Sequence, residues 1–194
     1  MNKKILIING HPDAGNEHYC DAIMQKYSSA ALAAGHELEA IRINQLNFEL
    51  LRSKGDFETN PPPPDVKDLQ NKVLWADHLV VIYPLWMGDM PALLKGFFEQ
   101  LFRRDFAGER LDEAAFKQQF EGRSARIIVT MGMPGYVYKW FFQAHTLKSL
   151  KRNILDFIGF KPVKATVIGK VFDGNEKELR LELKEVSKLG QLAK

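Results

Sequence analysis

Residues 79–103 have the sequence LVVIYPLWMGDMPALLKGFFEQLFR, which predicts a strand, a loop and a helix in direct succession. Leu79 to Tyr83 is an unbroken apolar run, typical of a strand that is buried on both faces. Two prolines, a tryptophan and a glycine follow in residues 84–91. From Pro91 to Arg103 the apolar residues recur at helical spacing: Leu93, Leu94, Phe97, Phe98 and Leu101.

The same alternation of strands and helices recurs along the rest of the chain. Residues 3–9 predict a further buried strand, and residues 126–130 and 163–168 predict two more strands. Residues 37–43 alternate as an edge strand would. Helices are expected over residues 16–35, with Asn16 as the N-cap and Gly35 as the stop, over residues 65–76 and 140–158, and near the C-terminus. Residues 44–65 lack periodicity and end in four prolines, which predicts an extended loop. Five strands alternating with five helices predict one α/β domain, residues 1–194, with a parallel sheet covered on both faces.

Composition excludes several classes of protein. The 194 residues are 45% hydrophobic and 26% charged, as in a globular protein, and no apolar stretch approaches the ~20 residues of a membrane span. The single cysteine, Cys20, excludes an internal disulfide and a cysteine-based zinc site, and we expect no other metal site. The N-terminus has no signal-peptide pattern, so we expect a cytoplasmic protein. The net charge of +3 is scattered rather than gathered in a stripe, which argues against nucleic-acid binding.

Ligands of such sheets bind at the carboxyl ends of strands where the strand order reverses, so the loops after strands one, three and four matter most. Residues 9–16 lead to a helix start whose N–H groups at Glu17, His18 and Tyr19 could hold an anion, although a structural turn explains the loop equally well. The loop lacks both the Walker lysine and the Gly-x-Gly-x-x-Gly pattern. Residues 83–91 suit a flat ligand, or Trp86 simply caps the sheet. Residues 130–138 add a hydroxyl, glycines and aromatic rings, and His145 follows on the next helix, where a surface role is the commoner one.

Together these loops resemble the flavodoxin-like NAD(P)H:quinone oxidoreductases, including bacterial relatives of the modulator of drug activity and the ancillary flavoproteins of potassium efflux. The resemblance covers residues 5–168 and is most specific over residues 75–99. It implies a three-layer sandwich whose five parallel strands follow the order 2-1-3-4-5.

The resemblance also assigns roles to residues of this chain. It implies that a flavin phosphate lies against His11, Glu17 and His18. The flavin ring would lie along Pro84, Leu85, Trp86, Met87 and Gly88, and its pyrimidine end beside Thr130, Met131, Gly132 and Met133. Tyr138 would bind the N1/O2 edge and act in catalysis. The catalytic histidine of the family corresponds to Ala144, and His145, one residue further on, is its nearest equivalent. Met87 and the Thr-Met-Gly-Met sequence depart from the family pattern, which bears on the identity of the substrate.

The implied function is the transfer of two electrons from NAD(P)H through flavin N5 to a quinone, with ping-pong kinetics because both substrates share one pocket. FAD is slightly favoured over FMN, because residues 44–65 give room for an adenosine. A homodimer is implied, with the aromatic residues at 97, 98, 102 and 138–142 serving its interface or the core. Two alternatives are a regulatory flavoprotein on a potassium-efflux transporter and a flavodoxin-type electron carrier. The positive charge and the lack of Ser or Thr in residues 11–16 argue against the carrier.

Overall fold

The computed structural model describes residues 2–15, 18–103, 106 and 119–194. Its centre is a five-stranded sheet in the order β2-β1-β3-β4-β5, with every neighbouring pair parallel. The strands are β1 (Lys4–Asn9), β2 (Glu37–Arg42), β3 (His78–Pro84), β4 (Ser124–Thr130) and β5 (Val163–Ile168). The parallel sheet and the strand order expected from the resemblance are therefore confirmed.

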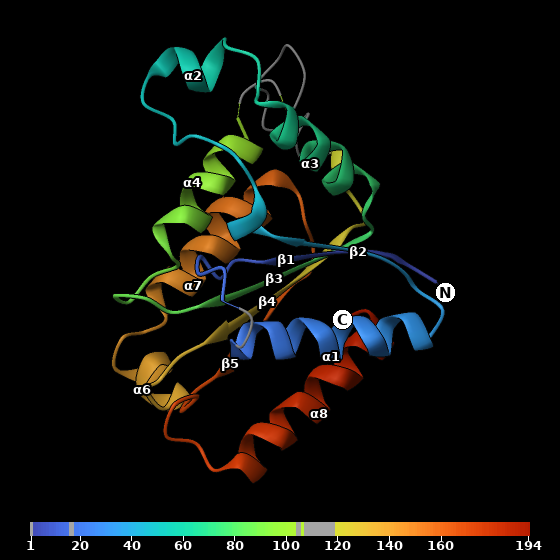
Figure 1. Cartoon of the computed structure of the whole chain (residues 1–194), viewed down its shortest axis with the longest axis vertical. Coiled ribbons are helices and arrows are strands. Elements are labelled where there is room, and N and C mark those ends of the chain that lie inside the picture. Colours follow the sequence, from blue (N-terminus) through green and yellow to red (C-terminus); the bar gives the residue numbers. More distant parts are fainter. Residues whose placement is uncertain (1, 16–17, 104–105, 107–118) are drawn as a thin grey trace.

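Helices cover both faces of the sheet (Figure 1). On one face α1 (Tyr19–Ala33) packs against α8 (Glu176–Leu192). The opposite face carries α3 (Pro64–Trp75), α4 (Ala92–Leu101) and α7 (His145–Ser149). Shorter elements are the 3-10 turn η1 (Ile43–Gln45), α2 (Lys54–Glu58), α6 (Gly135–Trp140) and the π-helical segment η3 (Leu150–Asp156). Among the described residues, none of the helices is both long and apolar enough to cross a membrane.

Strand β3 explains why this arrangement is stable. All seven of its residues are buried, and successive side chains point into the two different cores. Leu79, Val81 and Tyr83 pack with α4, whereas Val80 and Ile82 pack with α1 and α8. A strand buried on both faces needs no polar alternation, which is why an unbroken apolar run identifies it.

Three expectations about the helices were wrong in part. The helix expected over residues 140–158 is interrupted, because Gln143 and Ala144 both adopt left-handed backbone conformations, with φ of 51° and 47°. Helix α1 begins at Tyr19 with His18 as its N-cap, rather than at Asn16. The segment 44–65 contains the short helix α2, which begins with a reciprocal capping box between Ser53 and Asp56.

Candidate functional site

Backbone hydrogen bonds bring the ends of the strands together at one edge of the sheet. Gly10 N donates to Ile82 O at 2.7 Å, and Leu85 N donates to Thr130 O, also at 2.7 Å. A cavity of about 160 Å³, here called the strand-end cavity, opens between these loops. It is lined by His11, His18, Tyr19, Cys20, Pro84, Leu85, Trp86, Thr130, Met131, Gly132, Val171 and Phe172.

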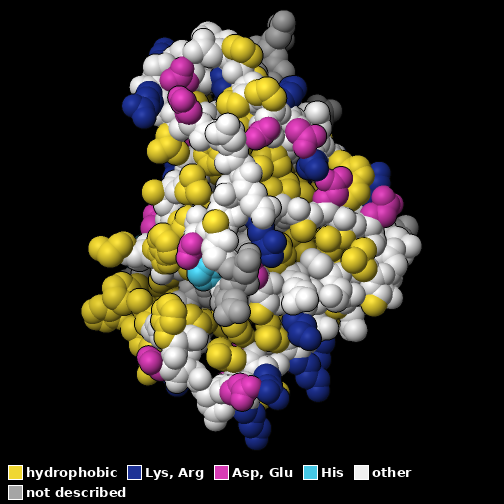
Figure 2. Space-filling view, in the orientation of Figure 1, with side chains coloured by type: hydrophobic (Ala, Val, Ile, Leu, Met, Phe, Trp, Pro, Cys, Tyr) yellow, Lys and Arg dark blue, Asp and Glu magenta, His cyan; other side chains and the backbone are white. Residues whose placement is uncertain are grey.

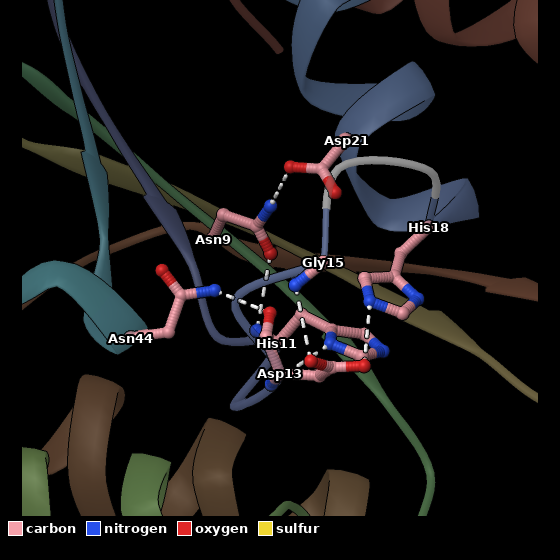
Figure 3. A network of polar contacts seen from close by, with 7 residues as sticks. All are labelled: Asn9, His11, Asp13, Gly15, His18, Asp21 and Asn44. Carbon is pink, nitrogen blue, oxygen red and sulfur yellow. Dashed lines mark hydrogen bonds and ion pairs between the residues drawn. The ribbon is translucent and has the colours of Figure 1, made fainter.

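The first loop is held in shape by polar contacts that run back into the sheet (Figure 3). Asn9 Oδ1 accepts from His11 N at 3.1 Å, and Asn9 Nδ2 donates to Asp21 Oδ1 at 2.9 Å. Asp21 in turn receives Arg42 Nε at 3.0 Å. From the β2 side, Asn44 Nδ2 donates to the backbone oxygen of Asp13. These contacts fix the path of the loop before any ligand arrives.

Two histidines face each other at the cavity wall. The His11 and His18 rings stack with centroids 3.8 Å apart and planes 14° apart, and Trp86 lies edge-on to His11 at 5.8 Å. Asp13 N donates to His11 Nδ1 at 3.3 Å, which leaves Nε2 to carry the proton of the neutral ring. Burial, and then the neighbouring His18, lower the pKa of His11. A bound anion would oppose this shift by favouring the cationic form of His11.

The start of α1 adds donors to the same cavity. His18 occupies the N-cap position without a side-chain capping bond, and no described residue accepts from the backbone N–H groups of Tyr19 and Cys20. The first N–H groups of a helix have no partner within the helix and carry partial positive charge. Two imidazoles beside free N–H groups form a donor set suited to a phosphate.

A second cavity of about 270 Å³, here called the tyrosine cavity, lies beyond Leu85, which lines both. Its other lining residues are Met87, Gly88, Met133, Tyr138, Phe142, His145 and Thr146. Met87 stands fully exposed at the tip of a tight turn, closed by paired hydrogen bonds between Trp86 and Asp89. Its φ of 49° is unusual for a residue with a side chain, a kind of strain that clusters at ligand sites. Leu85, Met87 and Met133 offer apolar surface to a flat ring.

The single cysteine is not suited to act as a nucleophile. Cys20 is 1% exposed, and its Sγ lies 3.5 Å from Thr130 Oγ1. Burial raises the pKa of the thiol to about 12, so the reactive thiolate is scarce at neutral pH. Cys20 therefore contributes shape to the cavity rather than a nucleophile.

The structure brings nearly all of the sequence-predicted site residues into these two cavities. His11, His18, Pro84, Leu85, Trp86, Thr130, Met131 and Gly132 line the first, whereas Leu85, Met87, Gly88, Met133, Tyr138 and His145 line the second. Glu17 lies outside the described residues. The described part of the chain holds no group of three or more His, Cys, Asp or Glu side chains placed for a metal ion.

Four lining residues were not predicted from the sequence as members of a site: Cys20, Val171, Phe172 and Thr146. Val171 and Phe172 follow β5, whose carboxyl end lies at the same edge, so the parallel order of the strands could have pointed to them. Thr146 lies next to His145 and was not considered.

An aromatic patch adjoins the tyrosine cavity. Figure 2 shows hydrophobic side chains gathered over α6 and the loop after β3. Its exposed members include Met87, Tyr136, Trp140, Phe141 and Phe142, with Trp140 and Phe141 at 85% and 79%. By contrast, Phe97 and Phe98 are buried in the core. The aromatic residues expected to serve either the core or an interface are therefore partly buried in the core and partly exposed on the surface.

A family model described as flavodoxin-like fold matches residues 3–189. The chain belongs to that family. A ribosyldihydronicotinamide dehydrogenase-like protein, traD, from Penicillium crustosum is 28% identical over 94% of this chain and 80% of its own length. An NAD(P)H:quinone oxidoreductase from Methanothermobacter marburgensis superposes with a TM-score of 0.81 at 22% identity, over 100% of this chain and 98% of its own. An FMN-dependent NADH-azoreductase from Bacillus anthracis, solved with FMN, gives a TM-score of 0.76 at 16% identity, over 100% and 99% of the two chains. The resemblance noted in the sequence is confirmed at the level of the family.

Proposed function

We propose that this protein is a flavin-dependent oxidoreductase that passes two electrons from NAD(P)H to a quinone-type acceptor. The observation that carries the proposal is the convergence of the stacked His11–His18 pair, the open start of α1 and two apolar loops at one edge of the sheet. A bound flavin would supply the redox chemistry, while the protein positions it and tunes its charge. Because donor and acceptor would use one pocket in turn, the kinetics would be ping-pong.

Different residues would bind the phosphate, hold the ring and stabilise charge. His11, His18 and the N–H groups of Tyr19 and Cys20 would hold the phosphate, because they combine imidazoles with helix-start donors. The ring would be held by residues 84–88 and 130–133, whose side chains and backbone line the two cavities. A hydrogen-bond donor at the tyrosine cavity, which Tyr138 and His145 line, would stabilise the negative charge that develops during reduction.

The proposal covers either FMN or FAD. The azoreductase neighbour was solved with FMN. The sequence argument for FAD is the room offered by residues 44–65, and part of this segment borders a groove of about 600 Å³. Heat release of the flavin that copurifies with the protein, followed by chromatography against both standards, identifies it.

Since NAD(P)H is an intracellular reductant, we propose that the reaction takes place in the cytoplasm.

An anaerobic titration with NADPH, repeated with NADH, tests the proposed function. We expect the visible bands of the flavin-loaded protein to bleach in one two-electron step and to return when a quinone is added. Parallel lines in double-reciprocal plots would support the ping-pong sequence. The proposal would be contradicted if the protein takes up no flavin, or if neither NADPH nor NADH bleaches the bound flavin.

We propose further that the aromatic patch pairs with a second copy of the chain. Soluble monomers seldom leave a contiguous patch of this kind bare, and the patch adjoins the tyrosine cavity. Replacing Phe141 by aspartate is expected to weaken the dimer at least about 100-fold, because an unpaired charge would be buried in the interface. Light scattering after size-exclusion chromatography measures this, with Leu32→Asp, at an exposed leucine of α1, as the matched control. A monomeric wild type, or a Phe141→Asp protein that stays dimeric, would contradict this pairing.

A further inference from the structure

The hydroxyl of Tyr138 is held from two sides. Tyr138 lies on α6 and is 2% exposed. Its Oη lies 2.8 Å from Thr146 Oγ1 and accepts from Leu147 N at 3.1 Å. Both partners belong to the first turn of α7.

A strained turn creates this contact. Helix α6 ends at Trp140, and the left-handed conformations of Gln143 and Ala144 then turn the chain before α7 begins. Ala144 N donates to the backbone oxygen of Tyr138 at 3.0 Å. A continuous helix over these residues would carry Thr146 two turns away from Tyr138 along its axis. The turn therefore places the Thr146 hydroxyl at the tip of the Tyr138 ring.

The arrangement of protons determines which hydroxyl can reach a ligand. A tyrosine hydroxyl has one proton to donate, and Leu147 N already occupies one of its acceptor positions. When Tyr138 donates to Thr146 Oγ1, the Thr146 proton is free to turn into the tyrosine cavity. Thr146 is half-buried and lines that cavity, so its hydroxyl lies between the buried tyrosine and the space a ligand would fill.

His145 is placed differently. Its ring lines the tyrosine cavity but is exposed, and among the described residues none forms a hydrogen bond with it. An exposed ring without an orienting partner can occupy several rotamers, whereas Thr146 is fixed by Tyr138. Preorganised donors stabilise developing charge far better than mobile ones.

We propose that Thr146 is the hydroxyl that donates to the bound flavin at this cavity, and that Tyr138 positions it by donating to its Oγ1. This inference rests on the proposed function. It assigns Thr146 a catalytic role that the sequence analysis gave to Tyr138 and His145, and it makes Tyr138 a positioning residue. The hydrogen-bonded pair of Tyr138 and Thr146, here called the relay, moves no electrons itself. It supplies a hydrogen bond that strengthens as negative charge grows on the flavin's acceptor edge.

The test compares Thr146→Val, which keeps the shape, with Thr146→Ser, which keeps the hydroxyl. In protein loaded with its copurifying flavin, we expect Thr146→Val to slow reduction by NADPH about 100-fold. We also expect it to weaken binding of the reduced flavin relative to the oxidised form about tenfold, which lowers the two-electron midpoint potential by about 30 mV. Thr146→Ser is expected to stay within about threefold of wild type in rate. Thr166→Val is the matched control, because Thr166 is a half-buried threonine of β5 whose hydroxyl also has a side-chain partner, Arg126, and which lines neither cavity.

The double variant Thr146→Val/Tyr138→Phe tests the coupling. If the tyrosine acts through the threonine, removing both is expected to cost little more than removing Thr146 alone. Additive losses would overturn the relay. So would a Thr146→Val protein that is less stable yet keeps the wild-type rate and potential, because the contact would then serve only the turn. A loss on His145→Gln without one on Thr146→Val would assign the donor to the histidine instead.

Failure of the relay is distinguishable from failure of the proposed function. Wild-type protein that binds flavin but is not bleached by NADPH would contradict the function alone. The potentials of wild type, Thr146→Val and Thr146→Ser could still be compared by chemical reduction, and a difference in that comparison would support the relay.

Discussion

Replacing both His11 and His18 by alanine is expected to weaken FMN binding about 1000-fold, while riboflavin, which has no phosphate, changes by less than about threefold. Hydrogen bonds to charged groups contribute about 1.5–3 kcal/mol each, so two of them give an effect of this size. Quenching of flavin fluorescence measures both affinities. Comparing the two ligands isolates the contribution of the phosphate to affinity, because any distortion of the ring site would affect FMN and riboflavin alike.

The contacts of the free protein show what the phosphate must displace. Asp13 Oδ2 pairs with His18 Nε2 at 3.0 Å, and its Oδ1 accepts from Gly15 N at 3.0 Å. The Asp13 side chain is 59% exposed, so giving up the ion pair costs little. Asp13→Asn is the matched control of opposite sign: removing a competing negative charge should strengthen FMN binding a few-fold. Weaker binding in that variant would mean that Asp13 orients His18 for the ligand.

The pH dependence of FMN binding follows from the same pair. The pKa of His11 is lowered in the free protein, so its ring is neutral at pH 7, and a bound phosphate would raise that pKa. Affinity should therefore rise as the pH falls through the pKa of the complex, and level off below the lowered pKa of the free protein. The second pKa of the phosphate itself, about 6, opposes this trend, so the informative quantity is the difference between wild type and the double alanine variant. Equal slopes in the two proteins would contradict phosphate binding by the histidines.

The strands and the position of the site could be predicted because each rests on a local signal. The buried runs at β1, β3 and β4 contain few residues that suit any other element, and parallel strands necessarily bring their carboxyl ends to one edge. Capping chemistry was equally local but was overlooked at α2, where Ser53 and Asp56 have the spacing of a capping box.

The break between α6 and α7 could not be predicted from local signals. Gln143 and Ala144 are ordinary helix residues, and neither favours the left-handed conformation that both adopt. Packing of the residues on either side of the turn holds them there, because Tyr138 and Leu147 are both buried and linked through the tyrosine hydroxyl. The contact between the Tyr138 and Thr146 hydroxyls depends on that packing, so it could be seen only in the structure.

Gly169→Ala is expected to reduce the free energy of unfolding by about 3 kcal/mol, through overpacking that side-chain movement cannot relieve. Gly169 follows β5, and a Cβ there would lie 2.4 Å from Gly135 N and 2.6 Å from Met133 O. Lys170 N also donates to Met133 O, so this strand end sets the path of the loop after β4. The loop must shift to admit a methyl group. Because that loop lines both cavities, flavin affinity should fall about tenfold or more as well.

Gly190→Ala distinguishes the loss of stability from the loss of flavin affinity. A Cβ at Gly190 would lie 2.4 Å from the backbone oxygen of Tyr27, where α8 crosses α1, and neither residue lines a cavity of the site. This change should destabilise the protein to a similar degree yet leave the flavin affinity of the folded protein unchanged. Denaturant unfolding without flavin measures the stabilities, and flavin titration at a temperature where both variants are folded measures the affinities. If Gly169→Ala loses stability but binds flavin as the Gly190→Ala protein does, the loop after β4 lines the cavities without holding the flavin.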